Sequence, residues 1–485
     1  MRNRLTTLVQ RSGHKYVAQR MEASLIHRES SEIVGHESIR RKGVGFVAIL
    51  LIIVLAVGLV NRFLLDKGRI GDESYVMTAD GGQYVKFEGT GSPTWHPVTN
   101  PVSARLILGE NVNPKKVKSK ALEDARMGHL MGISDAPASF TVAEEPSSSW
   151  ATCTIFTPAD PFDLSKPEKV ETAVLSHVTL NESAHRLTKN QAAVARSLDD
   201  GTYWLLLGSG DRVQFNPGDT SIMTALGLTA EQVSKATAVS TTFLSTIPQL
   251  PLLAVPQVPS AGLTSTHLPG IAIGSVISVE LPDDMVTYVV GLDGVQQISP
   301  MVARLLTVGG ASILREVSPT VLSNAPEADV IDLTLYPHDV PELAHDASVC
   351  STWDRRDGSS VSQRGIFTAS VLPLDSEDRS KLVETMPGNR SMTDWYYTRP
   401  GRGHFVRTTG EEDDSPIQGQ LYWVADNGMR YPLGTGNDGT YDDTLNALGL
   451  TGKTPIMAPW SVLQLLPEGD TLSPAAARVF PGNPF

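Results

Sequence analysis

The longest continuous stretch of apolar side chains lies near the start of the chain. Residues 43–60 read GVGFVAILLIIVLAVGLV and contain no charged side chain. A helix of this length nearly crosses a hydrocarbon core, and Phe63 to Leu65 can extend it because Arg62 can reach the membrane surface. The pattern predicts a transmembrane helix over residues 43–65. One alternative is a cleaved signal peptide, but the basic region before the run is 42 residues long and no small-x-small cleavage site follows it. A buried helix of a soluble protein is the other alternative.

A helical pattern precedes this run. Val17, Met21 and Leu25 lie one turn apart within KYVAQRMEASLIHR, residues 15–28, and basic residues flank them. This spacing predicts an amphipathic helix. Such a helix can lie on anionic lipid beside its own membrane span, or it can bind a cytosolic partner. The sequence leaves both interpretations open.

After residue 70 the pattern changes to short strands joined by glycine turns, which is typical of β-hairpins. Four hairpins of two kinds occur, and each is followed by a short apolar helix. The first kind lies at 75–87 with its helix at 103–109, and again from Tyr288 with its helix at 302–309. The second kind lies at 203–215 with its helix at 224–229, and again at 422–433 with its helix at 446–451.

The two kinds of hairpin alternate, which indicates an internal duplication. Tyr75 and Tyr288 are 213 residues apart, and Tyr203 and Tyr422 are 219 residues apart. Because two independent offsets nearly agree, we expect two similar halves related by pseudo-two-fold symmetry.

The segments between the hairpins predict a central sheet that both halves share. VISVEL (276–281) and VIDLTLY (330–336) alternate in apolar character and are expected to be strands of it. The predicted fold class is therefore α+β, with a single N-terminal transmembrane helix and four hairpin-helix repeat domains around a central β domain. The predicted boundaries are 1–42 for a cytosolic basic helix region, 43–65 for the transmembrane helix, 70–135 for repeat 1, 136–199 for a part of the central domain with Cys153, 200–260 for repeat 2, 261–286 for a central-domain strand, 287–328 for repeat 3, 329–399 for a second central part with Cys350, 400–475 for repeat 4 and 476–485 for the C-terminal tail.

Charge separates the two sides of the apolar run. Residues 1–42 hold nine Lys or Arg and four Glu, which gives them a net charge of +5. Since the net charge of the whole chain is −13, residues 43–485 carry a net charge of −18. Such an acidic body argues against nucleic acid as its partner. Arg40, Arg41 and Lys42 directly precede the run, so the positive-inside rule places the N-terminus in the cytoplasm and the residues after about 65 outside it.

The chain has two cysteines, Cys153 and Cys350, and both fall in the predicted outer compartment. A pair of cysteines in an oxidising compartment predicts one disulfide. They also occupy corresponding places in the two halves, which pseudo-two-fold symmetry would bring together. Two unrelated buried thiols remain the alternative.

Two glycine motifs resemble phosphate-binding loops. ALGLTGKT (447–454) has the relaxed P-loop spacing, and GTGNDG (434–439) has the spacing Gly-x-Gly-x-x-Gly. However, a P-loop needs a strand before its glycines and a helix after its Lys, whereas here a helix is predicted before the glycines and Pro455 follows Lys-Thr. We therefore interpret ALGLTGKT as a helix with a glycine cap and GTGNDG as a turn before a helix.

Other chemistry is sparse in the sequence. Gly-x-Ser-x-Gly, His-Glu-x-x-His and Cys-x-x-Cys do not occur, and the histidines lack zinc-ligand spacing. We accordingly predict no catalytic, cofactor-binding or metal-binding residue. The expected site residues are the disulfide pair alone, with ATP as a cofactor only if the chain hydrolyses it.

These features together resemble EccB, a membrane component of the actinobacterial type VII (ESX) secretion system. The resemblance rests on the two cysteines, the single apolar run and the segments SGHKYVAQRMEASLIHR, RIGDESYVMTADGGQYVKF, NPVSARLILG and YWVADNGMRYPLG. It covers almost the whole chain. It implies an elongated, quasi-two-fold periplasmic domain on a single inner-membrane helix. It also implies assembly with an EccC-type FtsK/SpoIIIE ATPase, EccD and EccE in a six-fold complex near the mycosin protease.

Three functions follow as expectations. The first is a structural core component that forms the periplasmic part of the secretion channel and anchors it to the cytosolic motor. The second is ATP hydrolysis, a label that the family sometimes carries. The third is binding of peptidoglycan, for which the aromatic groups Tyr203–Trp204, Tyr422–Trp423 and Trp395–Tyr396–Tyr397 could stack on sugars if they are exposed.

Overall fold

The computed structural model describes most of the chain and divides it into two compact units. It describes residues 8–27, 34–60, 70–87, 93–137, 140–142, 147–160, 163–280, 285–315, 322, 325–356, 358–385, 391–411, 415, 419–436 and 438–480. The first unit comprises Met1–Gly82 and Pro114–Arg126, and the second comprises Gln83–Asn113 and Met127–Phe485.

The first unit holds the N-terminal helices and a pair of strands. Its elements are the helices α1 (Leu8–His27) and α2 (Val34–Val60), the strands β1 (Tyr75–Thr78) and β4 (Lys115–Val117), and the 3₁₀ helix η2 (Ser119–Leu122). β1 and β4 pair in parallel, with Val76 opposite Lys115. In α1 the side chains of Val17, Met21 and Leu25 are exposed.

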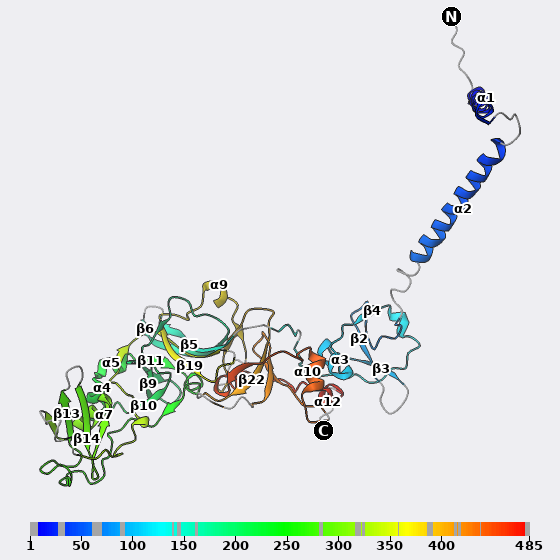
Figure 1. Ribbon diagram of the computed structural model, residues 1–485. Coiled ribbons are helices and arrows are strands. Elements are labelled where there is room, and N and C mark those ends of the chain that lie inside the picture. The colour runs from blue at the N-terminus through cyan, green and yellow to red at the C-terminus, as the bar shows by residue number, and fades with distance from the viewer. Residues whose placement is uncertain are drawn as a thin grey trace, which may run out of the picture. The chain divides into compact units, whose positions relative to one another are not determined.

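Helix α2, at the upper right of Figure 1, contains the long apolar run. The helix starts at Val34 rather than at Gly43, because helical geometry continues through the basic residues that precede the run. The end of the predicted span, residues 61–65, lies outside the described residues. Among the described residues, none of the helices has both the length and the apolar character that crossing a membrane requires.

A seven-stranded sheet lies at the centre of the second unit, and both predicted halves contribute to it. The strands follow the order β20-β21-β6-β5-β18-β19-β7 and are labelled in part in Figure 1. Their bounds are β5 Ser147–Asp160, β6 Asp163–Ser176, β7 His185–Arg186, β18 Ser348–Arg356, β19 Ser362–Ala369, β20 Val383–Glu384 and β21 Trp395–Tyr397. Each half supplies one long hairpin, β5–β6 or β18–β19. The halves also exchange short strands, since β7 pairs with β19 and β21 pairs with β6.

Three smaller sheets of the second unit share one topology. In each, three consecutive strands pair antiparallel, a helix follows, and a later strand pairs in parallel with the first. One sheet has β8 (Gln191–Ser197), β9 (Tyr203–Leu207), β10 (Arg212–Phe215) and β11 (Thr237–Val239), joined by β12 (Gln249–Leu250) and β17 (Glu342–Ala344). The next has β13 (Val276–Glu280), β14 (Met285–Val290), β15 (Val295–Ile298) and β16 (Ile313–Arg315). The last has β22 (His404–Thr409), β23 (Leu421–Val424), β24 (Arg430–Pro432) and β25 (Ile456–Pro459).

Short helices follow the hairpins, and their sequences explain where they begin and end. Helix α3 (Pro101–Leu108) starts after Asn100, whose side chain accepts a hydrogen bond from the Ser103 amide, and it ends at Gly109 with φ 73°. The antiparallel pair β2 (Gln83–Phe87) and β3 (Thr94–Pro97) precedes α3. The other helices are α4 Thr220–Leu226, α5 Ala230–Ser234, α6 Thr241–Leu244, α7 Pro300–Val308, α9 Ser376–Arg379, α10 Asp442–Leu448, α11 Trp460–Leu463, α12 Pro474–Ala477 and the 3₁₀ helix η3 Leu333–Leu335.

Two segments predicted for the central sheet lie elsewhere, so that prediction is wrong for both. The described part of VISVEL, Val276–Glu280, forms β13, which pairs with β14 in a smaller sheet, with Ile277 opposite Tyr288. VIDLTLY contains η3 instead of a strand. Its amides at Val330 and Ile331 donate to Oε1 of Gln296 at 2.8 and 2.7 Å, so one side chain replaces the strand partner.

The match between the first and third hairpins was also off by one strand. The hairpin directly before α7 is β14–β15, and the pair directly before α3 is β2–β3. The segment at 75–87 therefore does not correspond to the one that begins at Tyr288. The shared glycine turn misled the comparison, because consecutive hairpins in one sheet have similar patterns.

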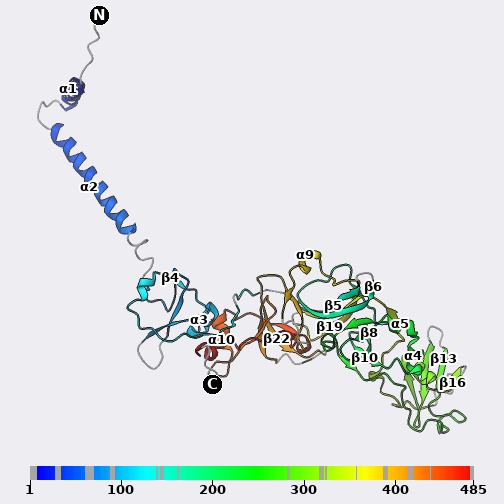
Figure 2. The ribbon, with the colours of Figure 1, turned by 180° about the vertical axis from the view of Figure 1, so that it is seen from behind.

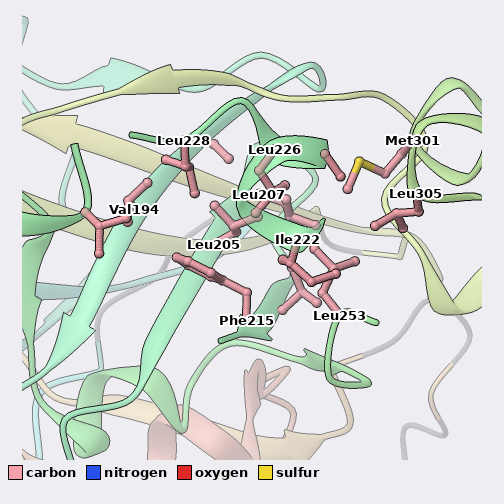
Figure 3. Close-up of a cluster of buried hydrophobic side chains, with 14 residues drawn as sticks. Val194, Leu205, Leu207, Phe215, Ile222, Leu226, Leu228, Leu253, Met301 and Leu305 are labelled. Atoms are coloured by element: carbon pink, nitrogen blue, oxygen red, sulfur yellow. The ribbon is translucent and has the colours of Figure 1, made fainter. Parts of the chain in front are cut away.

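The helices that follow the hairpins pack in pairs, α4 against α7 and α3 against α10. Figure 3 shows the first of these contacts, where Met301 and Leu305 of α7 meet Ile222 and Leu226 of α4 in one buried cluster with Phe215. Figure 2 shows α3 and α10 beside each other, and α12 also packs on α3.

Candidate functional site

The centre of the molecule's second unit is the contact between β5 and β18. Cys153 and Cys350 lie directly opposite each other in these neighbouring strands and are joined by a disulfide with an S–S distance of 2.04 Å. Both are buried, and Ala173, Leu175 and Tyr397 pack around them. Because the bridge closes a loop of 197 residues, the chain-entropy account gives it about 5 kcal/mol of stabilisation.

The other face of the same strand pair holds the smaller sheet that contains β25 (Ile456–Pro459) in place. Trp150 lies opposite Trp353, and its indole Nε1 donates to the Met457 carbonyl at 2.9 Å. The Met457 amide donates in turn to Ser148 Oγ at 2.7 Å. β25 is therefore attached to β5, although the two strands lie about three hundred positions apart in sequence.

Thr224 of α4 and Asn446 of α10 occupy equivalent positions in the two helix pairs but form different hydrogen bonds. Arg304 of α7 donates from Nη2 to the Thr224 carbonyl near the end of α4, at 3.2 Å. In the other pair Asn446 of α10, which matches Thr224 in the sequence pattern, donates from Nδ2 to the Gly109 carbonyl at 2.8 Å. The Arg304 bond adds to the one that the Thr224 carbonyl already accepts from the Gly227 amide, and the Asn446 bond satisfies the carbonyl of the residue that caps α3.

The glycine motifs form turns around α10. Helix α10 ends at Gly449 with φ 71°, and β25 follows the turn that contains Lys453. In GTGNDG the Gly436 amide donates to the Thr440 carbonyl at 2.7 Å, and the Gly434 carbonyl accepts from Thr444 Oγ1 at 2.7 Å. A phosphate cradle requires a helix that starts after the Lys-Thr, whereas this chain continues there as a strand.

The aromatic groups that could have stacked on sugars are mostly core residues. Trp204, Tyr422, Trp423, Tyr396 and Tyr397 are buried, and only the neighbouring Tyr203 and Trp395 are partly exposed. The sequence did not single out Trp460, which is 42% exposed at the start of α11. The guanidinium of Arg430 lies 4.9 Å from the centre of its ring.

A buried polar cluster lies beside Trp150. His404 Nε2 is 2.9 Å from Ser176 Oγ and 2.8 Å from Thr398 Oγ1, and its ring stacks on His177 at 4.5 Å. Burial, followed by the nearby His177, lowers the pKa of His404 from 6.5 to about 3. The imidazole is therefore neutral at physiological pH. Burial also raises the pKa of Tyr396, whose hydroxyl lies 3.0 Å from Ser176 Oγ.

Within the described residues, no group of three or more His, Cys, Asp or Glu side chains could hold a metal ion.

Comparison with known proteins identifies the family. The family described as "Type VII secretion system ESX-1, transport TM domain B" matches residues 3–482. The chain belongs to this family. The resemblance to EccB is thereby confirmed over nearly the whole sequence.

Curated members of the family are similar along their full length. The chain is 31% identical to the ESX-5 secretion system ATPase EccB5 of Mycobacterium tuberculosis, over 98% of this chain and 93% of that protein. It is 29% identical to the ESX-2 secretion system ATPase EccB2 of the same species, over 96% and 93%. It is 28% identical to the ESX-3 secretion system ATPase EccB3 of Mycolicibacterium smegmatis, over 99% and 91%.

Solved structures of family members share the fold. A chain of an intact ESX-5 inner membrane complex aligns with a TM-score of 0.73 at 29% identity, covering 100% of this chain and 97% of that one. A chain of an EccB3 dimer from the ESX-3 core complex aligns with a TM-score of 0.69 at 26% identity, covering 84% and 100%.

Proposed function

We propose that this chain is a structural core component of a type VII (ESX) secretion complex in the inner membrane. The observation that carries the proposal is the end-to-end alignment with a chain of an intact ESX-5 inner membrane complex. A protein whose whole length matches a subunit of such an assembly is expected to occupy an equivalent place in one. The similarity to a dimer of EccB3 supports self-association as part of that role.

The proposal includes a single membrane span over residues 43–65. The apolar part of α2 supports it, since residues 43–60 contain no charge and Arg40, Arg41 and Lys42 precede them. On the positive-inside rule the N-terminal helix α1 is cytoplasmic, and the second unit is periplasmic. An oxidising periplasm also fits the disulfide between Cys153 and Cys350.

Within the complex we assign the periplasmic unit the role of a stiff scaffold. The duplication predicted from the sequence finds support in the shared topology of the smaller sheets and in the exchanged strands β7 and β21. An EccC-type FtsK/SpoIIIE ATPase, EccD, EccE and the mycosin protease are its proposed partners, in a hexameric assembly. On this proposal the motor partner hydrolyses ATP, and this chain works without a bound cofactor.

Gentle detergent extraction of the tagged full-length protein, followed by mass spectrometry of what accompanies it, tests the proposal. We expect an FtsK/SpoIIIE-type ATPase and a polytopic membrane protein in one very large complex. If the protein emerges alone, the scaffold assignment fails.

ATP hydrolysis is the second candidate, because the curated relatives are named ATPases. The strand that follows Lys453 does not favour it. Purified protein that turns over ATP, and loses this activity in Lys453→Ala but not in Lys235→Ala, would establish this candidate in place of the scaffold. Lys235 is a suitable control because it lies on a distant helix end and pairs with Glu231.

A further inference from the structure

A cleft of about 410 Å³ opens over one face of the central sheet. Strands β5 and β18 supply its floor, the loop after β6 supplies one wall, and Phe367 of β19 lies on the opposite side. This volume falls within the range that small-ligand pockets occupy in proteins. Nothing in the scaffold role described above uses it.

The floor of the cleft is a row of cross-strand pairs that begins at the disulfide. Next to Cys153–Cys350 lies the pair Ala151–Thr352, followed by Ser149–Asp354. Because side chains of every second residue point to the same face of a sheet, these pairs all face the cleft. The row therefore changes from buried and apolar at the disulfide to polar and charged at its open end.

Asp354 is the charged group of this floor. It is only partly exposed, and no ion pair to it occurs among the described residues. Ser149, directly opposite, hydrogen-bonds the carboxyl group. Burial raises the pKa of Asp354, whereas the bond from Ser149 and the charge of Arg186 lower it. A partly buried carboxylate without a paired cation favours a ligand that supplies one.

The basic residues around the cleft leave this carboxylate incompletely compensated. The Arg186 guanidinium lies over Gly365 and 5.9 Å from the Phe367 ring centre, and its Nη2 donates to the Arg364 carbonyl at 3.1 Å. Arg399, which also lines the cleft, has an exposed side chain at the rim. Neither comes within the 4.0 Å that defines an ion pair with Asp354.

The wall of the cleft is held in an unusual backbone conformation. His177 has φ 54°, in the left-handed region, although it is not a glycine. Its amide donates to the Ser149 carbonyl at 2.9 Å, and its Nε2 lies 3.0 Å from the Ser147 carbonyl. These two contacts fix the point where the chain leaves β6 and folds Val178 and Leu180 onto the core beside the disulfide. Strained residues of this kind cluster at ligand sites, where surrounding contacts maintain them.

We propose that this cleft binds an ammonium or guanidinium group carried on an aliphatic stem, with the cation paired to Asp354 beside Ser149. The stem would lie against Ala151, Phe367 and Leu180, which line the same cleft. A basic side chain of a polypeptide and a free diamine share this chemistry. The net charge of the body, −18 outside the first 42 residues, attracts either one.

The test uses full-length protein in detergent with an environment-sensitive fluorophore on Thr179→Cys, an exposed position at the cleft. Ser234→Cys, exposed on α5, carries the same label as the control for effects away from the cleft. The probes are acetyl-Gly-Lys-Gly-amide, its uncharged norleucine analogue and 1,5-diaminopentane. We expect the lysine peptide to change the fluorescence at Thr179→Cys with a Kd on the order of 1 mM. The norleucine analogue should bind at least about tenfold more weakly.

Substitution then locates the cation. Asp354→Asn should weaken binding of the lysine peptide by about tenfold, whereas Asp293→Asn, which removes an exposed charge in another sheet's loop, should leave it unchanged. Binding of the diamine as well as the peptide would support a free diamine as the natural occupant, and binding of the peptide alone would support a polypeptide.

Two results would overturn the proposal. One is an equal response to the lysine and norleucine peptides, a comparison that stands even if Asp354→Asn fails to fold. The other is no response at about 10 mM of either cationic probe, since such a concentration exceeds a millimolar Kd.

Discussion

Cys153 and Cys350 occupy directly opposed positions on β5 and β18, the two strands through which the predicted halves of the chain meet. The disulfide therefore joins the two halves at the strand pair β5–β18, to which each half contributes one strand. Strand exchange has the same effect, because β7 pairs with a strand of the second half and β21 with a strand of the first. Neither half can leave the central sheet without breaking pairs in the other.

The double substitution Cys153→Ser and Cys350→Ser should lower the free energy of unfolding by up to about 5 kcal/mol, because the unfolded chain loses its cross-link. Urea denaturation of the purified protein measures the change. The matched control is Ser351→Ala, next to Cys350 on β18, which should cost far less. Thiol labelling of denatured protein should find free thiols only after reduction. Labelling of unreduced protein would contradict the disulfide.

The contact between α3 and α10 can be tested with two glycines that share a backbone conformation. Gly449 has φ 71° and Gly452 has φ 76°, so alanine costs about 1 kcal/mol of strain at either position. A Cβ at Gly449 would also collide with the side-chain amide of Asn111, whereas a Cβ at Gly452 would meet open space. Because Asn111 is exposed and its amide is the end of a flexible side chain that can turn aside, Gly449→Ala should destabilise the protein by only a few tenths of a kcal/mol more than Gly452→Ala in thermal or urea unfolding.

The collision itself can be removed to check this explanation. Adding Asn111→Ala to Gly449→Ala should recover the extra loss, because the alanine leaves the space that the new Cβ needs. If Gly449→Ala is as stable as Gly452→Ala and Asn111→Ala changes neither, the end of α10 and Asn111, which follows α3, do not meet as described.

Local signals in the sequence predicted the elements that neighbouring residues determine. Asn100 and Pro101 begin α3 and Gly109 ends it, which is the pattern of a capped helix. The interpretation of ALGLTGKT as a helix with a glycine cap is confirmed as well, because α10 ends at Gly449 with a positive φ, as α4 does at Gly227.

Contacts between distant segments could not be predicted in this way. Whether VISVEL joins the central sheet or pairs with β14 depends on which strand lies nearby in space, and both places accept its alternating pattern. The side-chain amide of Gln296 replaces a strand partner for Val330 and Ile331, and no periodic pattern signals this. The cleft was missed for the same reason, since Ser149 and Asp354 meet only through the register of β18 on β5.

The proposed membrane span makes a direct prediction. Leu51→Arg or Ile53→Asp places a charge in the middle of the apolar run and should raise the free energy of insertion by about 2.5–3.5 kcal/mol. Most of the protein should then leave the membrane fraction when cells are fractionated. The conservative change Ile53→Leu is the control and should remain with the membranes. If the charged variants also sediment with membranes, residues 43–65 do not provide the anchor.

His404 should make stability depend on pH. Burial and the neighbouring His177 lower its pKa from 6.5 to about 3. Between about pH 3 and pH 6.5 the imidazole is therefore protonated in the unfolded chain but neutral in the folded protein. The contribution of the neutral imidazole is therefore complete above pH 6.5 and is lost as the pH falls toward 3. Between pH 8 and pH 5 this residue should remove about 2 kcal/mol from the free energy of unfolding. His404→Gln should abolish that part of the pH dependence, while His338→Gln, whose side chain is 79% exposed, should preserve it. Urea denaturation at the two pH values measures the difference, and equal pH dependence in the unsubstituted protein and His404→Gln would show that the buried ring is not the group that titrates.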